Sequence, residues 1–425
     1  MRLRDVKKGP SPERPEFVRL SGEVLFERDR SSRVYWVDYP IAYADEISTD
    51  GNSWLILMNL LAASFGEDIT VDHPVDPYLL EHLKAVRREW HAWDQQWKLT
   101  RFVCTNLQTM ARAGQKTGAF FSGGIDSYHS LLRNNESPNN EGDAAEAITD
   151  LVTVHGFDIP LASYDHFRSL QHHLEAAARS LNKTHLVAIT NVRTFEDVYD
   201  KVWQGIAFGS ALAFIAYGLS LRFKEVIVAS SYQYGFLEPN GSHPLTDSLF
   251  SSKALRIVHD GAISNRVEKT NRIARSRVAL SGLHVCPNKR GDETFSHLNC
   301  SICEKCQRTM VTLDLFNAKS DAVTFDWSQY TMQGISRNYI KHRASAPFYE
   351  EIYTAAMELG RLDIARAIRQ SLRRTYVFRF LGDVEDWTVQ RFPRIRKYRV
   401  KLIGVRTRLY KLLGLHMTSA PTARQ

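Results

Sequence analysis

Apolar and polar positions along the middle of the chain follow two different periods. Short apolar runs rich in β-branched residues predict buried strands at residues 118–121, 151–155, 184–189, 225–230 and 255–258. Runs with helical spacing lie between or after these strands, at residues 126–133, 160–181, 195–222 and 264–281. This alternation predicts an α/β fold with a Rossmann-like parallel sheet that helices cover on both faces. Right-handed crossovers then place the ligand crevice at the carboxyl ends of the strands.

The two ends of the chain have other patterns. Residues 1–112 predict an extra N-terminal α/β unit of unknown role, with strands at Phe17–Glu27 and Arg33–Tyr39 and helices at Ser53–Phe65 and Pro77–Trp97. From about residue 319 onward the pattern is mostly helical. We therefore predict three domains, which span residues 1–112, 113–318 and 319–425.

One segment has the composition of a membrane span. Val202–Leu221 contains no charged residue, and Gly205 and Gly209 form a pair of small residues four positions apart. The segment also contains Gln204, and it leads directly into a predicted strand. A helix that covers a sheet explains both features, so we expect no transmembrane span.

Composition indicates a globular protein with a large core. The chain has 425 residues, of which 44% are apolar and 24% charged. Its first residues are charged and include no apolar stretch typical of a secretory signal, and its five cysteines do not suggest a disulfide framework. We therefore predict a cytoplasmic protein.

The net charge of +8 comes from one segment. Residues 387–425 contain ten Lys or Arg and no acid, so the remaining residues 1–386 carry 8 − 10 = −2. Apolar residues in this tail recur at helical spacing, namely Ile395, Tyr398, Leu402, Val405, Leu409 and Leu412. Such a basic amphipathic helix could dock on its own protein, or bind RNA, another protein or an anionic membrane surface.

The segment from Gly118 to Ser127 carries the clearest chemical signal. An apolar strand ends in Ser122-Gly123-Gly124, and Asp126 and Ser127 then begin a helix. Small residues between a strand and a helix start leave backbone N–H groups free to face an anion, and the two hydroxyl groups add donors. The order of residues differs from the lysine-containing phosphate loop Gly-x-x-x-x-Gly-Lys-Ser/Thr, and it suits a pyrophosphate leaving group.

Four of the five cysteines form a cluster, C-x13-C-x2-C-x2-C, made by Cys286, Cys300, Cys303 and Cys306. Four thiolates close the shell of a structural zinc ion. Cysteines spaced by two residues also hold iron–sulfur clusters, which are the competing interpretation. Cys104 lies outside the cluster, and we interpret it as a buried apolar residue.

The Ser122–Ser127 loop resembles the pyrophosphate loop of the N-type ATP pyrophosphatase superfamily, which includes several synthetases and tRNA thiolases. The resemblance implies an adenine nucleotide alpha hydrolase type of fold and cleavage of ATP between its α- and β-phosphates. AMP is placed on a substrate oxygen and a nucleophile then displaces it. The loop residues Ser122, Gly123, Gly124, Asp126 and Ser127 would surround the outer phosphates with Mg²⁺, and His155, after the second strand, would contact adenine through its backbone.

The cysteine cluster, about 160 residues after the loop, makes the chain similar to the 7-cyano-7-deazaguanine synthase family. This family converts a carboxylate to an amide and then a nitrile with ATP and ammonia, and it contains structural zinc. The resemblance implies a ligase that forms carbon–nitrogen bonds, with Lys269 at the α-phosphate and Asp247 at the substrate. The first cysteine gap is longer than in that family, and the similarity covers only about residues 115–318.

These departures leave other functions open. The acceptor is expected to be a carboxylate-bearing substrate, and the nitrogen donor to be ammonia or an amine. One alternative is a tRNA-modifying enzyme of the same superfamily that grips RNA with its basic tail. Another is a component of a multi-protein pathway, in defence or in polysaccharide or deazapurine modification, that acts on a macromolecule or binds nucleotide without turnover.

Overall fold

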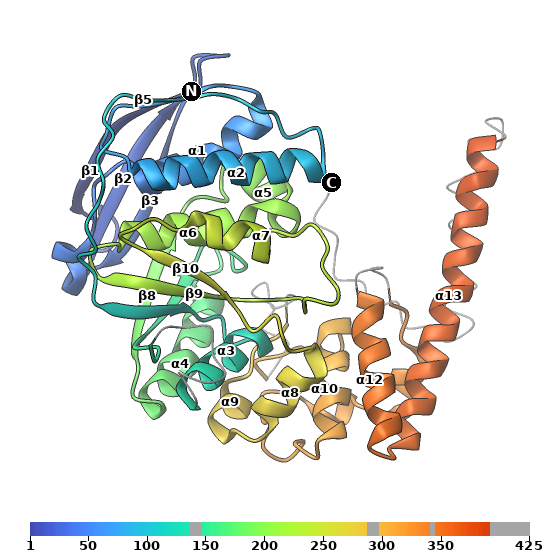
Figure 1. Cartoon of the computed structure of the whole chain (residues 1–425). Coiled ribbons are helices and arrows are strands. Elements are labelled where there is room, and N and C mark those ends of the chain that lie inside the picture. Colours follow the sequence, from blue (N-terminus) through green and yellow to red (C-terminus); the bar gives the residue numbers. More distant parts are fainter. Residues whose placement is uncertain (137–145, 287–296, 341–344, 392–425) are drawn as a thin grey trace. The chain divides into compact units, whose positions relative to one another are not determined.

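The computed structural model of the chain describes residues 1–136, 146–286, 297–340 and 345–391 (Figure 1). The chain divides at Ser264 into two compact units, Met1–Ser264 and Asn265–Gln425. We describe each unit by itself. The predicted domain limits near residues 112 and 318 do not coincide with this division.

A single sheet of ten strands forms the centre of the first unit, in the order β10-β9-β6-β7-β8-β3-β2-β1-β4-β5. Its first half is the predicted parallel sheet, made of β6 (Lys116–Phe120), β7 (Asp150–His155), β8 (Thr184–Thr190), β9 (Phe223–Ala229) and β10 (Arg256–Asp260). In chain order these five strands are arranged 3-2-1-4-5, so the connections reverse direction on the two sides of β6. The connections that follow β6 and β9 therefore lead to opposite faces of the sheet. Open α/β sheets bind ligands in the crevice between two such connections.

Helices cover both faces of this parallel half, as predicted (Figure 1). One face carries α3 (Ile125–Glu136) and α4 (Tyr164–Ser180), and the other carries α6 (Phe208–Gly218) and α7 (Pro244–Asp247). The predicted helix 195–222 is interrupted: α5 (Val198–Lys201) is followed by one π-helical turn, η2 (Trp203–Ala207), before α6 begins. The short 3-10 helix η3 (Ser248–Phe250) follows α7.

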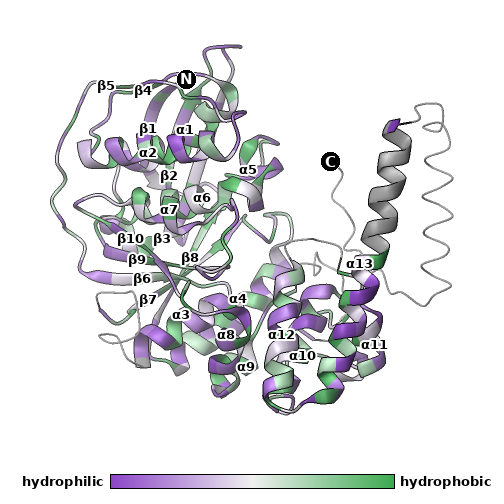
Figure 2. Ribbon diagram, turned by 45° about the vertical axis from the view of Figure 1, so that its right-hand side comes forward, coloured by the Kyte–Doolittle hydropathy of each residue, from purple (hydrophilic) through white to green (hydrophobic). Residues whose placement is uncertain are grey.

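The uncharged segment around α6 is buried between two layers of the fold. The sheet covers one side of α6, and α1 (Asn52–Phe65), whose residues 52–63 are all buried, covers the other (Figure 2). The rings of Trp54 and Phe214 meet edge to face with centroids 5.3 Å apart, and Ser210 donates from Oγ to the Ile56 carbonyl over 3.2 Å. Within the described residues, no helix combines the length and the apolar character that crossing a membrane requires.

The N-terminal residues extend the same sheet. The predicted strands are present as β2 (Phe17–Leu25) and β3 (Ser32–Pro40), and β3 pairs antiparallel with β8, with Val37 opposite Thr190. The other N-terminal elements are β1 (Arg2–Pro10), η1 (Ile41–Glu46), β4 (Ile69–Val71), α2 (Pro77–Trp93) and β5 (Phe102–Cys104). Residues 1–112 thus share one sheet and one hydrophobic core with the residues that follow them.

The second unit is helical within its described residues. Its elements are α8 (Arg266–Ala274), α9 (Arg277–Gly282), α10 (Glu304–Leu315), η4 (Trp327–Gln329), α11 (Met332–Arg337), α12 (Ala346–Glu358) and α13 (Leu362–Arg391). The predicted helix 264–281 is therefore two helices, α8 and α9. Tyr349, Ile352, Ile364 and Ile368 are fully buried in the core that joins α12 to α13. The basic amphipathic seam predicted from Ile395 onward lies outside the described residues.

Candidate functional site

The loop Ser122–Ser127 lies at the carboxyl end of β6, the strand from which the parallel sheet extends in both directions. Phe121 continues the strand pairing, since its N–H donates to the Val152 carbonyl over 2.8 Å. The chain then leaves the sheet and enters α3 at Ile125. The structure therefore places the predicted phosphate loop where a parallel sheet presents its ligand crevice.

The loop closes on itself through its two serines. Gly123 has a φ of 73°, a left-handed conformation that glycine adopts without strain. The Gly124 N–H donates to Ser122 Oγ over 3.4 Å, Ser127 Oγ donates to the Gly124 carbonyl over 3.1 Å, and the two serine Oγ atoms are 3.5 Å apart. Ser122 is exposed while Ser127 is buried. The loop thus forms a compact corner with one hydroxyl group at the surface.

Asp126 adds a carboxylate to this corner. It lies in the first turn of α3, where backbone N–H groups lack helical acceptors and favour negative charge. An anion bound at the same helix end would be repelled by the Asp126 carboxylate. A divalent cation between carboxylate and phosphate would remove this repulsion.

A chain of hydrogen bonds from the neighbouring strands β7 and β8 holds the residue that precedes the corner. Thr153 on β7 donates from Oγ1 to the Phe121 carbonyl over 2.7 Å. That hydroxyl group in turn lies 2.8 Å from Nε2 of His185 on β8. Because the Thr153 hydrogen is committed to Phe121, His185 must donate from Nε2. Three adjacent strands therefore fix the carbonyl that precedes the loop.

His155 ends β7 with its side chain in the core. Its ring is 1% exposed, is stacked on Phe167 with centroids 4.2 Å apart, and lies with Nε2 3.1 Å from the Pro160 carbonyl. Burial lowers the pKa of His155 to about 4, so the ring is neutral at pH 7. The next residue, Gly156, has a φ of 102°, and a Cβ there would lie 2.0 Å from the Thr190 carbonyl oxygen. The side chain of His155 is therefore used inside the protein, and contact between its backbone and adenine stays a prediction.

Asp247 is 1% exposed and its carboxylate is used inside the protein. Oδ2 accepts from Ser242 Oγ and lies 2.8 Å from His259 Nδ1, and Oδ1 accepts from the His243 N–H over 3.3 Å. This arrangement positions the α7 loop on β10. The role of Asp247 at a substrate stays a prediction.

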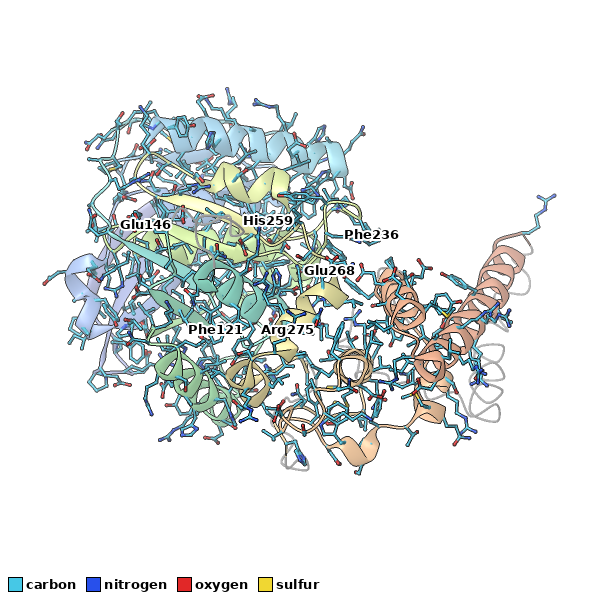
Figure 3. The ribbon with its side chains drawn as sticks, turned by 60° about the horizontal axis from the view of Figure 1, so that its bottom comes forward. Phe121, Glu146, Phe236, His259, Glu268 and Arg275 are labelled. Carbon is cyan, nitrogen blue, oxygen red and sulfur yellow. The ribbon has the colours of Figure 1, made fainter. Side chains whose placement is uncertain are left out.

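His259 is a buried residue that the sequence analysis missed. It lies on β10, next to the last residue of the strand, and is 9% exposed (Figure 3). Asp247 orients its ring through Nδ1, and Nε2 has no hydrogen-bond partner among the described residues. Its pairing with Asp247 across twelve positions has no local sequence signal, which is why only the fold revealed it.

The two glycines of the uncharged segment have different surroundings. A Cβ on Gly209 would lie 2.3 Å from the Gly241 carbonyl oxygen, which accepts the Gly209 N–H over 2.7 Å, and 2.9 Å from Asp247 Oδ1. Gly209 therefore allows the start of α6 to touch the loop before α7. A Cβ on Gly205 would meet nothing within 4 Å.

Lys269, predicted at the α-phosphate, belongs to the second unit. It lies in the first half of α8 and is 1% exposed. Asn265 and Glu268 form a capping box at the start of this helix, which fixes its first turn. Lys269 is one of several cations that lower the pKa of Glu351 on α12, although burial raises that pKa overall. Its relation to the Ser122–Ser127 loop stays a prediction.

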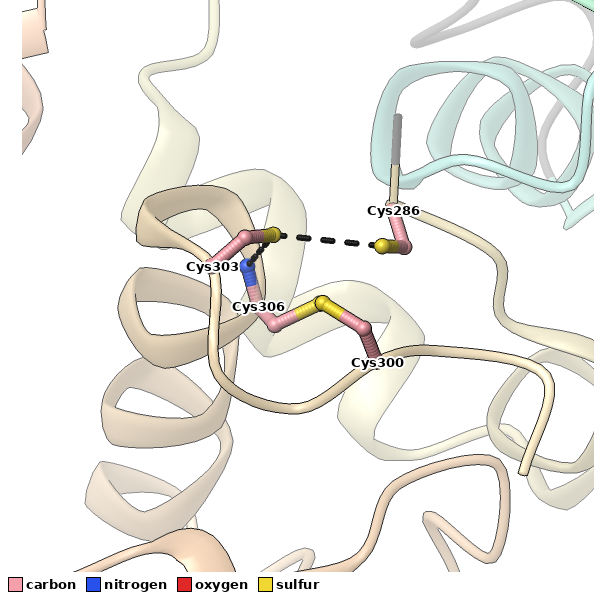
Figure 4. Close-up of side chains that lie close together, drawn as sticks. All are labelled: Cys286, Cys300, Cys303 and Cys306. Carbon is pink, nitrogen blue, oxygen red and sulfur yellow. Dashed lines mark hydrogen bonds between the residues drawn. The ribbon is translucent and has the colours of Figure 1, made fainter. Parts of the chain in front are cut away.

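The second unit also contains the four-cysteine cluster (Figure 4). The four sulfur atoms lie within 4.8 Å of one another, and all four residues are buried. Cys286 Sγ is 3.9 Å from Cys303 Sγ, and Cys300 Sγ is 3.8 Å from Cys306 Sγ. Four sulfur ligands about 2.3 Å from one tetrahedral ion would be about 3.8 Å apart. The cluster therefore has the dimensions to hold a single metal ion such as zinc.

Short local structures hold these cysteines in place. Cys303 caps α10, and its sulfur accepts from the Cys306 N–H over 3.5 Å. Asn299 accepts from the N–H groups of Val285 and Cys286 and donates to the Leu283 carbonyl, so it joins the two segments that supply the ligands. Its role is visible only in the tertiary structure.

Cys104 is far from the loop in the sheet. It ends β5, which lies seven strand positions from β6, a separation of about 33 Å at the usual strand spacing. Burial raises the pKa of its thiol to about 11. A thiol with a raised pKa is a weak nucleophile at neutral pH. Cys104 packs against the hydrophobic core but is half-buried, so the prediction of a buried apolar residue is correct only in part.

Comparisons of the chain with protein-family models, with curated proteins and with solved structures give no match. Functional interpretation therefore depends on the loop, on the sheet that holds it and on the cysteine cluster.

Acid is expected to destabilise the protein through His185, whose hydrogen bond to Thr153 helps to hold the Phe121 carbonyl before the loop. Burial lowers the pKa of His185 to about 4, against about 6.5 in an unfolded chain. Above pH 6.5 the ring is neutral in both the folded and the unfolded chain. As the pH falls from 6.5 toward 4, only the unfolded chain takes up the proton, so the free energy of unfolding decreases. His185→Gln keeps an N–H donor for Thr153 but does not titrate, so it should reduce the loss of unfolding free energy between pH 7 and pH 4.5 by about 2 kcal/mol. Urea denaturation at both pH values measures this.

The exposed His172 provides a matched control for that experiment. His172→Gln should leave the pH dependence of the unfolding free energy unchanged. An equal loss of stability in the wild type and in His185→Gln would contradict the prediction.

Metal binding is expected at one ion per chain. Elemental analysis of the purified protein should find one equivalent of zinc, and Cys303→Ala or Cys306→Ala should lower this content at least tenfold, because three thiolates leave the shell incomplete. Cys104→Ala is the matched control and should retain the full content. Iron with acid-labile sulfide in place of zinc would contradict a single-ion site.

Proposed function

We propose that this chain is an ATP-dependent, adenylate-forming ligase that binds ATP at the Ser122–Ser127 corner. The observation that carries the proposal is the position of this corner. A glycine-serine loop at the carboxyl end of β6, where the strand order reverses, offers backbone N–H and hydroxyl donors in the place where open α/β sheets bind phosphates. The outer phosphates of ATP are its proposed ligand, and AMP is the group transferred.

Mg²⁺ is part of this proposal because of Asp126. With ATP bound, the carboxylate of Asp126 and the phosphates would share one helix end, and Mg²⁺ would bridge them and offset their charge. Ser122 would donate a hydrogen bond to a phosphate oxygen, and Ser127 would do so once its hydroxyl group turns away from the Gly124 carbonyl. Gly123 and Gly124 would let the backbone approach them closely.

The acceptor is proposed to be a carboxylate that occupies the crevice between β6 and β9. An oxygen of this carboxylate attacks the α-phosphate, the bond to the β-phosphate breaks, and pyrophosphate leaves. An amine or ammonia then attacks the acyl adenylate and AMP leaves, which forms the carbon–nitrogen bond. The segment after β9 faces this crevice, and it is anchored by the Ser230 N–H, which donates to the Asp260 carbonyl over 2.8 Å.

Zinc is the proposed occupant of the four-cysteine cluster, with a structural role. Four thiolates complete a tetrahedral shell and leave no position for a reactive water molecule. Bound metal would stabilise the fold by holding the segment that contains Cys286 against the start of α10, where Cys303 and Cys306 lie.

Asp126→Ala tests the proposed chemistry. Incubation of the wild type with ATP, Mg²⁺, ammonia and a panel of carboxylates should release AMP and pyrophosphate, and the variant should lose this activity by at least 100-fold, as expected for lost charge stabilisation at a reacting phosphate. Mass spectrometry and a pyrophosphate assay measure the products. Release of ADP and phosphate in place of AMP would contradict the proposal.

Asp165→Ala is the matched control for this substitution. Asp165 is an exposed acid in the first turn of α4, the helix that follows the next strand of the sheet. Its removal changes the net charge by the same amount and should leave AMP release unchanged. Circular dichroism spectra should be the same for both variants and the wild type.

A second candidate function is RNA modification by the same chemistry, favoured by the ten Lys or Arg of residues 387–425. In that case transfer RNA would bind with an affinity that falls steeply with salt concentration, because basic residues release counterions from phosphates. Deletion of residues 387–425 would then weaken binding at least tenfold in a filter-binding assay. Binding that survives the deletion unchanged would exclude a role for the tail in RNA binding.

A further inference from the structure

The first unit contains a cavity of about 310 Å³, open to solvent, whose lining includes no residue of the proposed ATP site. Cavities of this size can hold a small organic molecule. Its walls come from four segments that are far apart in sequence: the β2–β3 turn with the start of β3, the end of α1, Gln96–Trp97, and residues 196–202 around α5. Both the N-terminal residues and the segment that follows β8 are therefore needed to form it.

The cavity is separate from the Ser122–Ser127 corner. Val37 of β3 pairs with Thr190 at the carboxyl end of β8. Arg33, which lines the cavity, precedes Val37 by four residues and therefore lies on the same face of the sheet. In the strand order, β3 is three positions from β6, about 14 Å at the usual spacing. It also lies on the opposite side of β6 from β9, where the proposed acceptor crevice is found.

Three cationic side chains line the cavity, namely Arg28, Arg33 and Lys201. The guanidinium group of Arg28 lies over the Phe65 ring, 4.4 Å from its centroid, and that of Arg33 lies 4.9 Å from the centroid of Phe26. Cation–π contacts of this kind restrict a long side chain before any ligand arrives. Lys201 is exposed at the end of α5.

Of the two acids in the wall, Asp197 is already neutralised from within the protein. Its Oδ2 accepts from Arg33 Nη1 over 3.0 Å and from the Tyr35 hydroxyl over 2.7 Å, and its Oδ1 accepts from the Tyr199 N–H over 2.9 Å. If the Arg33–Asp197 pair is set aside, the remaining charged residues of the wall are Arg28, Lys201 and the exposed Glu196. Arg28 also has an ion pair outside the wall, with its Nε 3.5 Å from Asp29 Oδ2, and solvent screens this pair because both side chains are about half exposed. The wall thus has an excess of one positive charge.

The uncharged part of the wall is mixed: Ser64 and Gln96 are polar, and the other four residues are apolar. Phe65 and Trp97 contribute aromatic surface, and Val198 and Val202 contribute aliphatic surface. A flat apolar ligand would gain contact with these side chains, and an anionic group on it would gain contact with Arg28 and Lys201.

We propose that this cavity binds a small organic anion composed of an apolar ring and a phosphate or carboxylate group. The ring lies against Phe65 and Trp97, and the anionic group lies between Arg28 and Lys201. Residues 1–112 then have a function of their own, because they supply Arg28, Arg33, Phe65 and Trp97.

Isothermal titration of the full chain with phenyl phosphate tests the proposal. Three probes separate the two parts of the ligand: phenyl phosphate carries ring and charge, inorganic phosphate carries only charge, and benzyl alcohol carries only the ring. We expect phenyl phosphate to bind at least tenfold more tightly than either of the others. Equal affinity for phenyl phosphate and inorganic phosphate would overturn the proposed ligand class.

Substitutions locate the binding. Arg28→Gln and Lys201→Gln should each weaken phenyl phosphate binding at least fivefold, while Arg33 is left in place because it pairs with Asp197. Lys7→Gln, at an exposed position on β1, is the matched control and should have no effect. Ser122→Ala should also leave this binding unchanged. Binding that is lost in Ser122→Ala, or that is unaffected by both cavity substitutions, would overturn the site.

Discussion

The position of β6 between β7 and β9 is the constraint on which the rest of the first unit depends. All three strands are parallel, so the chain must leave β6 at its carboxyl end and return through a helix. The turn at that end is therefore a strand-to-helix turn, with backbone N–H groups of the next helix exposed at its start. Gly123 and the two serines make such a turn compact, and Thr153 and His185 anchor the carbonyl before it.

The N-terminal residues stabilise this arrangement in two ways. Their strands extend the sheet beyond β8, and α1 covers the outer side of α6. An uncharged helix such as α6 needs apolar contacts on both sides, and one sheet supplies them on only one. The N-terminal residues thus share a hydrophobic core with α6 and the parallel strands, and they also form most of the 310 Å³ cavity.

Several predictions from the sequence were confirmed because the responsible patterns are local. Each of the five strands of the parallel half lies within two residues of the predicted position, since apolar β-branched runs indicate buried strands wherever they occur. The four cysteines were recognised as a group from their spacing alone. Other elements have no such pattern: β1 has only one fully buried residue, Leu3, so its sequence does not alternate and it was not predicted.

The sequence by itself determined the chemistry available to this protein: a glycine-serine turn, four thiols and an alternation of strands and helices. Tertiary structure decided how these parts are used. It joined residues 1–112 to the sheet through the pairing of β3 with β8, buried Asp247 against His259, and formed an open cavity between segments more than a hundred residues apart. The physical reason is that the periodicity of apolar residues indicates only which side of a helix or strand is buried. Which element packs against that side depends on the packing of the whole fold.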